Sequence, residues 1–315
     1  AYADRFDGYS AAIDDVLSCS DNTKVYWMEF DKNGKKNKIY LKMCPIEIGE
    51  LIKENLFIPI NTTVLTSATL SAGGNFEFFK SRIGLNIFSN KEVFENIFDS
   101  PFNYNEQAML CVPDDIVEPN NPEFVKNFCN YAQNIVEVTH GSTFFLCTSF
   151  RQIRTLKTCL LESGNFDHID ILCQGEMHRS KLLQKFKSSH SSVLIGTDSF
   201  WEGVDVPGDA LKCVVIVKLP FRVPSEPLYQ ARAEKLESEG RSAFFHYALP
   251  ISIIKFKQGF GRLIRSSYDE GVVICLDKRL RTKQYGRYFI ESLPELPVVF
   301  GQSDDILSNV KKFFR

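Results

Sequence analysis

The stretch 192-SVLIGTDSFWEGVDVPG-208 joins a short apolar run to a loop that is rich in glycine and carboxylates. Its first part, 192–196, carries branched apolar residues without polar alternation, which predicts a strand buried on both faces. The second part starts at Gly196 and ends at Pro207 and Gly208, residue types that end regular structure. A buried strand that leads directly into a polar loop is typical of the parallel sheet of an α/β protein.

The same rhythm extends to both sides of this stretch, from about residue 100 to the end of the chain. Apolar segments rich in β-branched residues alternate with amphipathic segments, which predicts a parallel sheet with helices on both faces. In such sheets ligands bind beyond the carboxyl ends of the strands. The expected strands are 108–112, 143–148, 169–173, 192–196, 213–219 and 271–276, and the expected helices are 122–138, 151–163, 177–188, 226–239, 243–265 and 279–292.

The first hundred residues have a different pattern. The segments 25-VYWMEF-30 and 38-KIYLKM-43 flank 31-DKNGKKN-37, whose Asn-Gly pair suits the tight turn of a hairpin. A short helix is expected around 46–55. The segment 62-TTVLTSATL-70 then predicts a buried strand that runs into small hydroxyl residues.

Composition describes an ordinary globular protein. The chain has 315 residues, of which 44% are hydrophobic and 24% are charged, and its formal net charge is −2. The charge is uneven, because residues 241–287 hold ten Lys and Arg against three acids, which indicates a region that meets anions. The nine cysteines lie singly, without the spacing of a metal site, and we expect buried reduced thiols in a cytoplasmic protein with no membrane segment.

Two arginines in an apolar neighbourhood form the first chemical signal. In 258-QGFGRLIR-265 the expected helix places Gln258, Arg262 and Arg265 on one face, where two guanidinium groups suit a polyphosphate. A dinucleotide-binding fingerprint is excluded, because Ile264 occupies the position of its third glycine and no strand precedes the motif. A structural pair of arginines is the alternative.

Three strand ends carry further candidates. In 196-GTDSFWEGVDVPG-208 glycines let backbone amides approach a ligand, and Thr197 can contact phosphate. Hydroxyl residues also follow strands in 66-TSATL-70 and in 147-CTSFRQI-153. The second of these suits phosphate at a helix N-terminus, although it serves equally well as a helix cap.

In this order and spacing, the four segments resemble motifs III, IV, V and VI of superfamily 2 helicases, in the spelling of the DinG/XPD branch. The resemblance covers nearly the whole chain. It is carried further by 201-WEGVDVPG-208, 218-KLPFRVPSEPL-228, 26-YWME-29, 44-CPIEIGELIKENLF-57 and 100-SPFNY-104.

The resemblance implies a role for each matching residue. Arg262 and Arg265 would face the γ-phosphate of ATP across a cleft between two RecA-like motor domains, with Gln258 beside them in the catalytic set. Ser67, Thr69, Glu202 and Gly203 would couple hydrolysis to movement. Ser149, Thr197 and Asp205 would contact the backbone of single-stranded DNA.

The resemblance also implies a larger protein. The chain has no Gly-x-x-x-x-Gly-Lys-Ser/Thr loop and no Asp-Glu-x-His segment, which such motors need to hold phosphates and Mg²⁺. We therefore expect residues 1–98 to be a remnant of motor domain 1 with its inserted domain, and residues 99–315 to be a RecA-like motor domain 2.

The missing N-terminal motor domain, ATP with Mg²⁺ and a DNA strand tracked 5′ to 3′ would be the partners. An iron–sulfur domain would lie upstream, if present, and this chain alone should be inactive. Two alternatives stay open, a nucleic-acid-binding adaptor without catalysis and an unrelated nucleotide-binding α/β enzyme.

Overall fold

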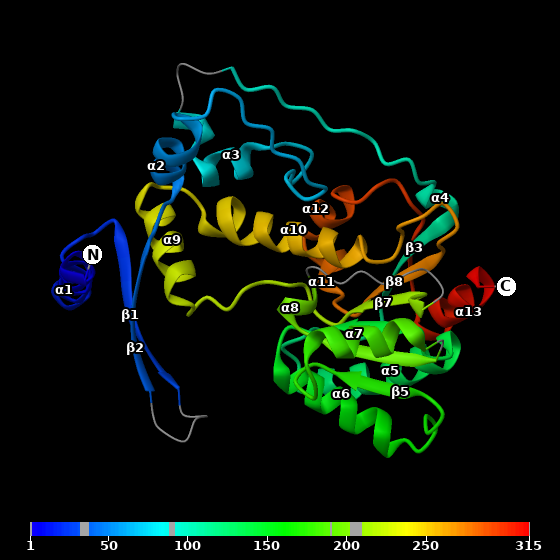
Figure 1. Cartoon of the computed structure of the whole chain (residues 1–315). Coiled ribbons are helices and arrows are strands. Elements are labelled where there is room, and N and C mark those ends of the chain that lie inside the picture. The colour runs from blue at the N-terminus through cyan, green and yellow to red at the C-terminus, as the bar shows by residue number, and fades with distance from the viewer. Residues whose placement is uncertain (1, 32–37, 88–91, 190, 202–209, 315) are drawn as a thin grey trace. The chain divides into compact units, whose positions relative to one another are not determined.

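The computed structural model describes residues 2–31, 38–87, 92–189, 191–201 and 210–314 (Figure 1). The chain divides into two compact units, which are described separately. The first unit comprises Ala1–Glu95 and Phe221–Pro250, and the second comprises Asn96–Pro220 and Ile251–Arg315. The second segment of the first unit is thus inserted between the two parts of the second unit in the sequence.

A seven-stranded sheet forms the centre of the second unit. Its strand order is β5-β6-β4-β7-β8-β3-β9, and every neighbouring pair is parallel, which confirms the expected α/β class. The strands are β3 (Ala108–Pro113), β4 (Thr143–Leu146), β5 (Asp170–Cys173), β6 (Ser192–Gly196), β7 (Cys213–Ile216), β8 (Gly271–Cys275) and β9 (Val298–Gly301).

Helices cover both faces of this sheet, because its central strands are apolar on both sides. Phe145 belongs to the core that α5, α6 and α13 cover, while the neighbouring Phe144 points to the other face and packs on Phe200 of α8. The helices of this unit are α4 (Tyr104–Gln107), α5 (Phe124–Thr139), α6 (Phe150–Glu162), α7 (Arg179–Ser188), α8 (Asp198–Trp201), α10 (Leu249–Phe260), α11 (Arg279–Thr282), α12 (Gly286–Glu291) and α13 (Ser303–Phe313).

Two expected helices differ from the structure. The helix expected over 243–265 is a π-helical turn, Phe244–Ala248, followed by α10, which ends at Phe260. The chain turns there because Gly259 and Gly261 favour helix weakly and the Asp269 carboxylate accepts the backbone N–H groups beyond. Gln258, Arg262 and Arg265 therefore do not share a helical face. The helix expected over 279–292 is divided into α11 and α12.

The first unit contains a two-stranded antiparallel sheet and short helices. Strands β1 (Lys24–Asp31) and β2 (Lys38–Pro45) pair as the expected hairpin, whose tip at 32–37 lies outside the described residues. The remaining elements are α1 (Tyr2–Ser18), α2 (Gly49–Ile52), a π-helical turn (Lys53–Phe57), α3 (Glu77–Ile83), a 3₁₀ turn (Leu85–Ile87), α9 (Pro227–Ser238) and the π-helical turn Phe244–Ala248.

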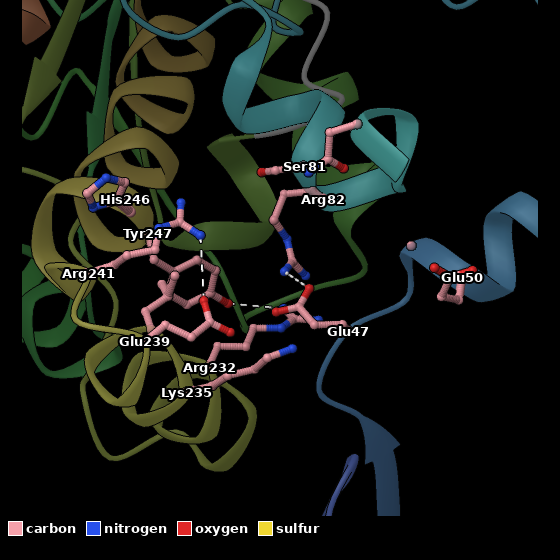
Figure 2. Close-up of a pocket in the computed structure, with 13 residues that line it drawn as sticks. Glu47, Glu50, Ser81, Arg82, Arg232, Lys235, Glu239, Arg241, His246 and Tyr247 are labelled. Carbon is pink, nitrogen blue, oxygen red and sulfur yellow. Dashed lines mark hydrogen bonds and ion pairs between the residues drawn. The ribbon is translucent and has the colours of Figure 1, made fainter. Parts of the chain in front are cut away.

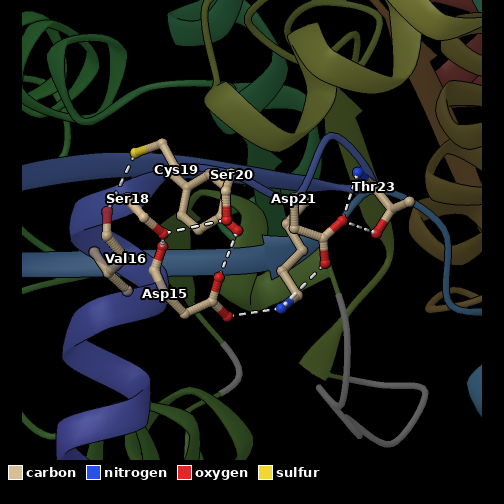
Figure 3. Close-up of polar contacts among 9 residues, drawn as sticks. Asp15, Val16, Ser18, Cys19, Ser20, Asp21 and Thr23 are labelled. Atoms are coloured by element: carbon tan, nitrogen blue, oxygen red, sulfur yellow. Dashed lines mark hydrogen bonds and ion pairs between the residues drawn. The ribbon is translucent and has the colours of Figure 1, made fainter.

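The end of α1 is fixed to the hairpin by one carboxylate (Figure 3). Asp15 accepts hydrogen bonds from Lys24 Nζ and Tyr26 Oη, both at 2.7 Å. Asp21 adds a second ion pair with Lys24 at 3.2 Å. The helix and the strand are thereby held together although the surrounding side chains are largely exposed.

The segment 62–70 is not the buried strand expected from its sequence. Residues 62–67 belong to no helix or strand, and Val64 is 82% exposed. The β-branched residues favour an extended backbone, but no strand of the described part of the chain pairs with it. The prediction was wrong because a strand requires a partner as well as a propensity.

Candidate functional site

Three neighbouring strands of the second unit end side by side. In the register of the sheet Cys173 pairs with Ile195, and Leu146 pairs with Gly196. The ladder continues for one residue, because Gln174 N donates to Ile195 O at 2.9 Å and Cys147 N donates to Gly196 O at 2.8 Å. The sheet thus brings together the two strand ends that carry Ser149 and Thr197.

Thr197 is held by a side chain from the adjacent strand end. Its backbone N and its Oγ1 donate to Gln174 Oε1 at 2.6 Å and 3.0 Å, and only 7% of Thr197 is exposed. Its carbonyl accepts from Phe200 N at 2.7 Å, at the start of α8. Both donors of Thr197 are therefore occupied, and binding of a phosphate there requires Gln174 to release them.

Ser149 caps α6. Its Oγ accepts from Gln152 N at 3.3 Å, while Gln152 Oε1 accepts from Thr148 N at 2.8 Å and Thr148 Oγ1 at 3.1 Å. Ser149 therefore caps the helix, which is the alternative that the sequence left open. Ser149 is exposed at the positive end of a 13-residue helix, so its hydroxyl also faces the solvent where an anion is favoured.

Trp201 connects the strand ends to the first arginine. Its buried indole donates from Nε1 to Cys147 O at 3.3 Å. Its carbonyl accepts two hydrogen bonds from Arg262, from Nη2 at 2.6 Å and from Nε at 3.1 Å. The guanidinium group therefore holds the backbone of Trp201, which is the last described residue before 202–209.

Gly259 permits this close packing. A Cβ atom there would lie 3.0 Å from Leu146 Cδ1 and 3.1 Å from Trp201 Cζ3. The preceding residue, Gln258, has a buried Oε1 that accepts no hydrogen bond in the described part of the chain. Buried amide oxygens are rarely left without a donor, so this atom is available to a ligand or to a neighbouring segment.

The backbone around the second arginine is shaped by Asp269. Its Oδ2 accepts from Arg265 N at 2.7 Å and from Ser266 N at 2.9 Å. Gln107 secures the same loop by donating to the carbonyls of Ser266 and Asp269, at 3.0 Å and 2.9 Å. The Arg265 side chain is exposed, so a rigid loop presents its charge to solvent.

The remaining candidates are not placed in this group. Ser67 and Thr69 lie in the first unit, Ser67 exposed and Thr69 partly buried, with their hydroxyl oxygens 3.2 Å apart. Glu202, Gly203 and Asp205 lie outside the described residues.

Sequence reasoning missed Gln174, Asp269 and Asp277. Gln174 directly follows the strand expected at 169–173, so the strand-end argument applied to Thr197 could have found it. Asp277, which follows β8, is fully buried and accepts from Leu219 N at 2.9 Å and from Arg279 Nη2 at 2.6 Å. Its partners are distant in sequence or lie beyond the strand, and a sequence pattern does not reveal them.

The cysteines at the strand ends are structural. Burial raises the pKa of the Cys173 thiol to about 12 and also raises that of Cys147, so both remain protonated at neutral pH. All nine cysteines are free. The described residues contain no cluster of His, Cys, Asp and Glu able to hold a metal ion, and no helix among them has the length and apolarity needed to cross a membrane.

The group as a whole is suited to anions. It combines a capped helix N-terminus, hydroxyl and amide donors at adjoining strand ends, and two arginines on a turn that packs against them. It supplies positive charge and hydrogen-bond donors, the features that bind an anion.

Comparison with known proteins agrees with this chemistry. Residues 132–296 match the family of helicase C-terminal domains. The chain is 40% identical over 269 residues to the ATP-dependent DNA helicase YoaA of Haemophilus influenzae, covering 85% of this chain and 40% of YoaA. It is 36% identical over 295 residues to the 3′-5′ exonuclease DinG of Bacillus subtilis, covering 92% of this chain and 31% of DinG.

The fold has solved relatives as well. An XPD helicase structure superimposes with a TM-score of 0.61 and 15% sequence identity, over 90% of this chain and 49% of that one. This likeness concerns the fold alone. The chain spans less than half the length of each of these relatives.

Proposed function

Because the chain belongs to the family of helicase C-terminal domains, we propose that it is the C-terminal motor portion of an ATP-dependent DNA helicase. The observation that carries this proposal is the fork of Arg262 on the Trp201 carbonyl. This contact joins the turn that carries the arginines to the loops at the strand ends. Hydrolysis of a nucleotide bound at the arginines could therefore change how tightly these loops bind a DNA strand.

In this proposal Arg262 and Arg265 complete an ATP site whose phosphate loop and Mg²⁺ ligands belong to motor domain 1 of the same polypeptide. An arginine at the γ-phosphate stabilises the charge that develops during phosphoryl transfer. Gln258 and Glu202 would link the ATP site to the contacts with DNA. Gly203, Ser67 and Thr69 would lie in the segments that couple hydrolysis to movement. Residues 1–98 would be a remnant of motor domain 1 and its inserted domain, and 99–315 motor domain 2.

Single-stranded DNA is the proposed track. Ser149, Thr197 and Asp205 would contact its sugar–phosphate backbone, and such contacts carry no sequence information. We further propose 5′ to 3′ movement, a role in DNA repair or replication in the cytoplasm, and an iron–sulfur or nuclease domain upstream. One relative is named as an exonuclease and another as a helicase. The adaptor alternative has no support in these relatives, whose names are those of enzymes.

The test is DNA-stimulated phosphate release by the whole protein with Mg²⁺ present. Arg265→Ala should lower ATP turnover by roughly 10³-fold or more, the loss typical of a removed arginine finger. Arg281→Ala is the matched control, since Arg281 is an exposed arginine of the same unit that pairs with Asp114. Turnover retained in Arg265→Ala would contradict the proposed role.

A further inference from the structure

A pocket of about 310 Å³ lies entirely within the first unit and contains none of the residues assigned above to ATP or DNA (Figure 2). It is formed by α3, by α9 with the turn that follows it, and by the segment that leads into α2. Four cationic side chains line it, namely Arg82, Arg232, Lys235 and Arg241.

A close backbone approach and a side-chain hydrogen bond build this pocket. Gly84 ends α3 with a φ of 77°, and a Cβ atom there would lie 2.5 Å from Gly49 O. Arg232 Nε donates to Ile46 O at 2.7 Å, which fixes α9 to the segment before α2. The surrounding cations are therefore held by a packed framework.

Two of the arginines share one aromatic ring. The Cζ atoms of Arg82 and Arg232 lie 5.7 Å and 5.8 Å from the centre of the Tyr247 ring, which is only 3% exposed. Arg232 Nη1 also donates to Tyr247 Oη at 3.0 Å. Stacking and hydrogen bonding hold both guanidinium groups in fixed positions, which lowers the entropic cost of binding an anion.

The carboxylates of the pocket do not balance its cations. Glu47 pairs with Arg82 at 2.7 Å, and Glu239 approaches Arg241 at 3.7 Å. In the described part of the chain no carboxylate lies within ion-pair distance of Arg232 or Lys235. The third acid, Glu50, pairs with Lys53 at 3.2 Å and is drawn apart from the other side chains in Figure 2.

The Arg82 guanidinium responds to this imbalance. Burial lowers its pKa below the ordinary value, the nearby charge of Arg232 lowers it further, and Glu47 offsets only part of the effect. A like charge disfavours the protonated form in this way when neutralisation is incomplete. An anion in the pocket would favour the protonated guanidinium and offset the repulsion from Arg232.

We propose that this pocket binds a phosphate group, with Lys235 and Arg241 as its exposed contacts and Arg82 and Arg232 as its fixed wall. A volume of about 310 Å³ suits a small charged ligand. The phosphate comes either from a free nucleoside polyphosphate or from the backbone of a nucleic-acid strand. Binding here needs no ATP hydrolysis, so its failure would leave the proposed helicase function standing.

The experiment titrates the 315-residue chain with pyrophosphate at low ionic strength, followed by calorimetry. Wild type should bind with saturation. Lys235→Glu should weaken binding by about tenfold or more, the scale of a lost charge-assisted hydrogen bond. Lys235→Arg should stay within about threefold, because the charge is kept. Lys126→Glu, at an exposed lysine of α5 in the second unit, makes the same charge change outside the pocket and should have no effect.

Competition then separates the two sources. Displacement of pyrophosphate by ATP but not by an oligodeoxythymidine strand assigns the pocket to free nucleotide, and the reverse assigns it to strand backbone. Displacement by neither overturns both assignments. The phosphate site itself is overturned if wild type shows no saturable binding, or if Lys235→Glu and Lys126→Glu behave alike while all variants unfold at the same temperature.

Discussion

Arg262 and Arg265 are three residues apart in the sequence and differ in the contacts and the exposure of their side chains. The Arg262 guanidinium donates twice to the Trp201 carbonyl and is half-buried, whereas Arg265 is exposed. Arg262→Ala should lower the free energy of unfolding by about 1.5–3 kcal/mol, because charge-assisted bonds to a buried carbonyl are lost. Arg265→Ala should change it by less than about 0.5 kcal/mol.

Urea unfolding of the 315-residue chain measures both variants. The sequence left a structural pair of arginines open as the alternative, and the contacts of Arg262 support a structural role for that residue. Equal free energies of unfolding for the two variants would show that the two hydrogen bonds from Arg262 to the Trp201 carbonyl do not form in solution.

Asp277 offers a second comparison between two arginine pairs. Its carboxylate is fully buried, and it holds Leu219 N and the half-buried Arg279. Asp277→Ala should lower the free energy of unfolding by about 3–5 kcal/mol, since the Leu219 N–H and the half-buried Arg279 guanidinium both lose a buried acceptor. Asp114→Ala, which breaks the exposed pair with Arg281, should cost no more than about 1 kcal/mol. Similar midpoints in a denaturant titration would contradict this ranking.

At the scale of elements, α10 meets β4 and α8 through a glycine. Gly259→Ala should lower the free energy of unfolding by about 1–2 kcal/mol, because a Cβ atom 3.1 Å from the buried Trp201 ring overpacks the contact by more than the gain in helix propensity. Gly8 of α1 is the control, since nothing lies within 4 Å of its Cβ position and alanine there should not destabilise. Thermal unfolding of the two variants tests the contrast, which fails if both shift in the same direction.

The elements also show how much of the fold can be predicted from the sequence. Strand 192–196 was predicted to the residue, because a continuous apolar run in a parallel sheet is set by burial alone. The end of α10 was placed five residues too late, because the apolar periodicity continues past Gly259 and Gly261 while the Asp269 carboxylate binds the backbone N–H groups of Arg265 and Ser266 in a turn. Thr197 was recognised as a strand-end residue, but its partner Gln174 comes from a neighbouring strand whose place in the sheet no local pattern gives.

At the scale of the whole molecule, the segment 62–67 has the sequence of a strand, but no strand among the described residues pairs with it. Val64 and Leu65 are 82% and 41% exposed, and no backbone N–H of 62–67 donates to a described residue. If the proposed function is right, strands of motor domain 1 in the longer polypeptide pair with this segment and bury it. Its amides should then exchange rapidly in the 315-residue chain and more slowly in the whole protein by about 10²-fold or more, since paired core strands open only by larger unfolding.

Residues of β6 provide the internal reference, because they are paired in both proteins and should be protected in each. Hydrogen exchange read by mass spectrometry on the two proteins gives the ratio directly. Equal, rapid exchange of 62–67 in both would mean that the segment remains unpaired in the whole protein. The assignment of Ser67 and Thr69 to a coupling motif at the end of a motor-domain strand would then fail, while the arginine site of the second unit would be untouched.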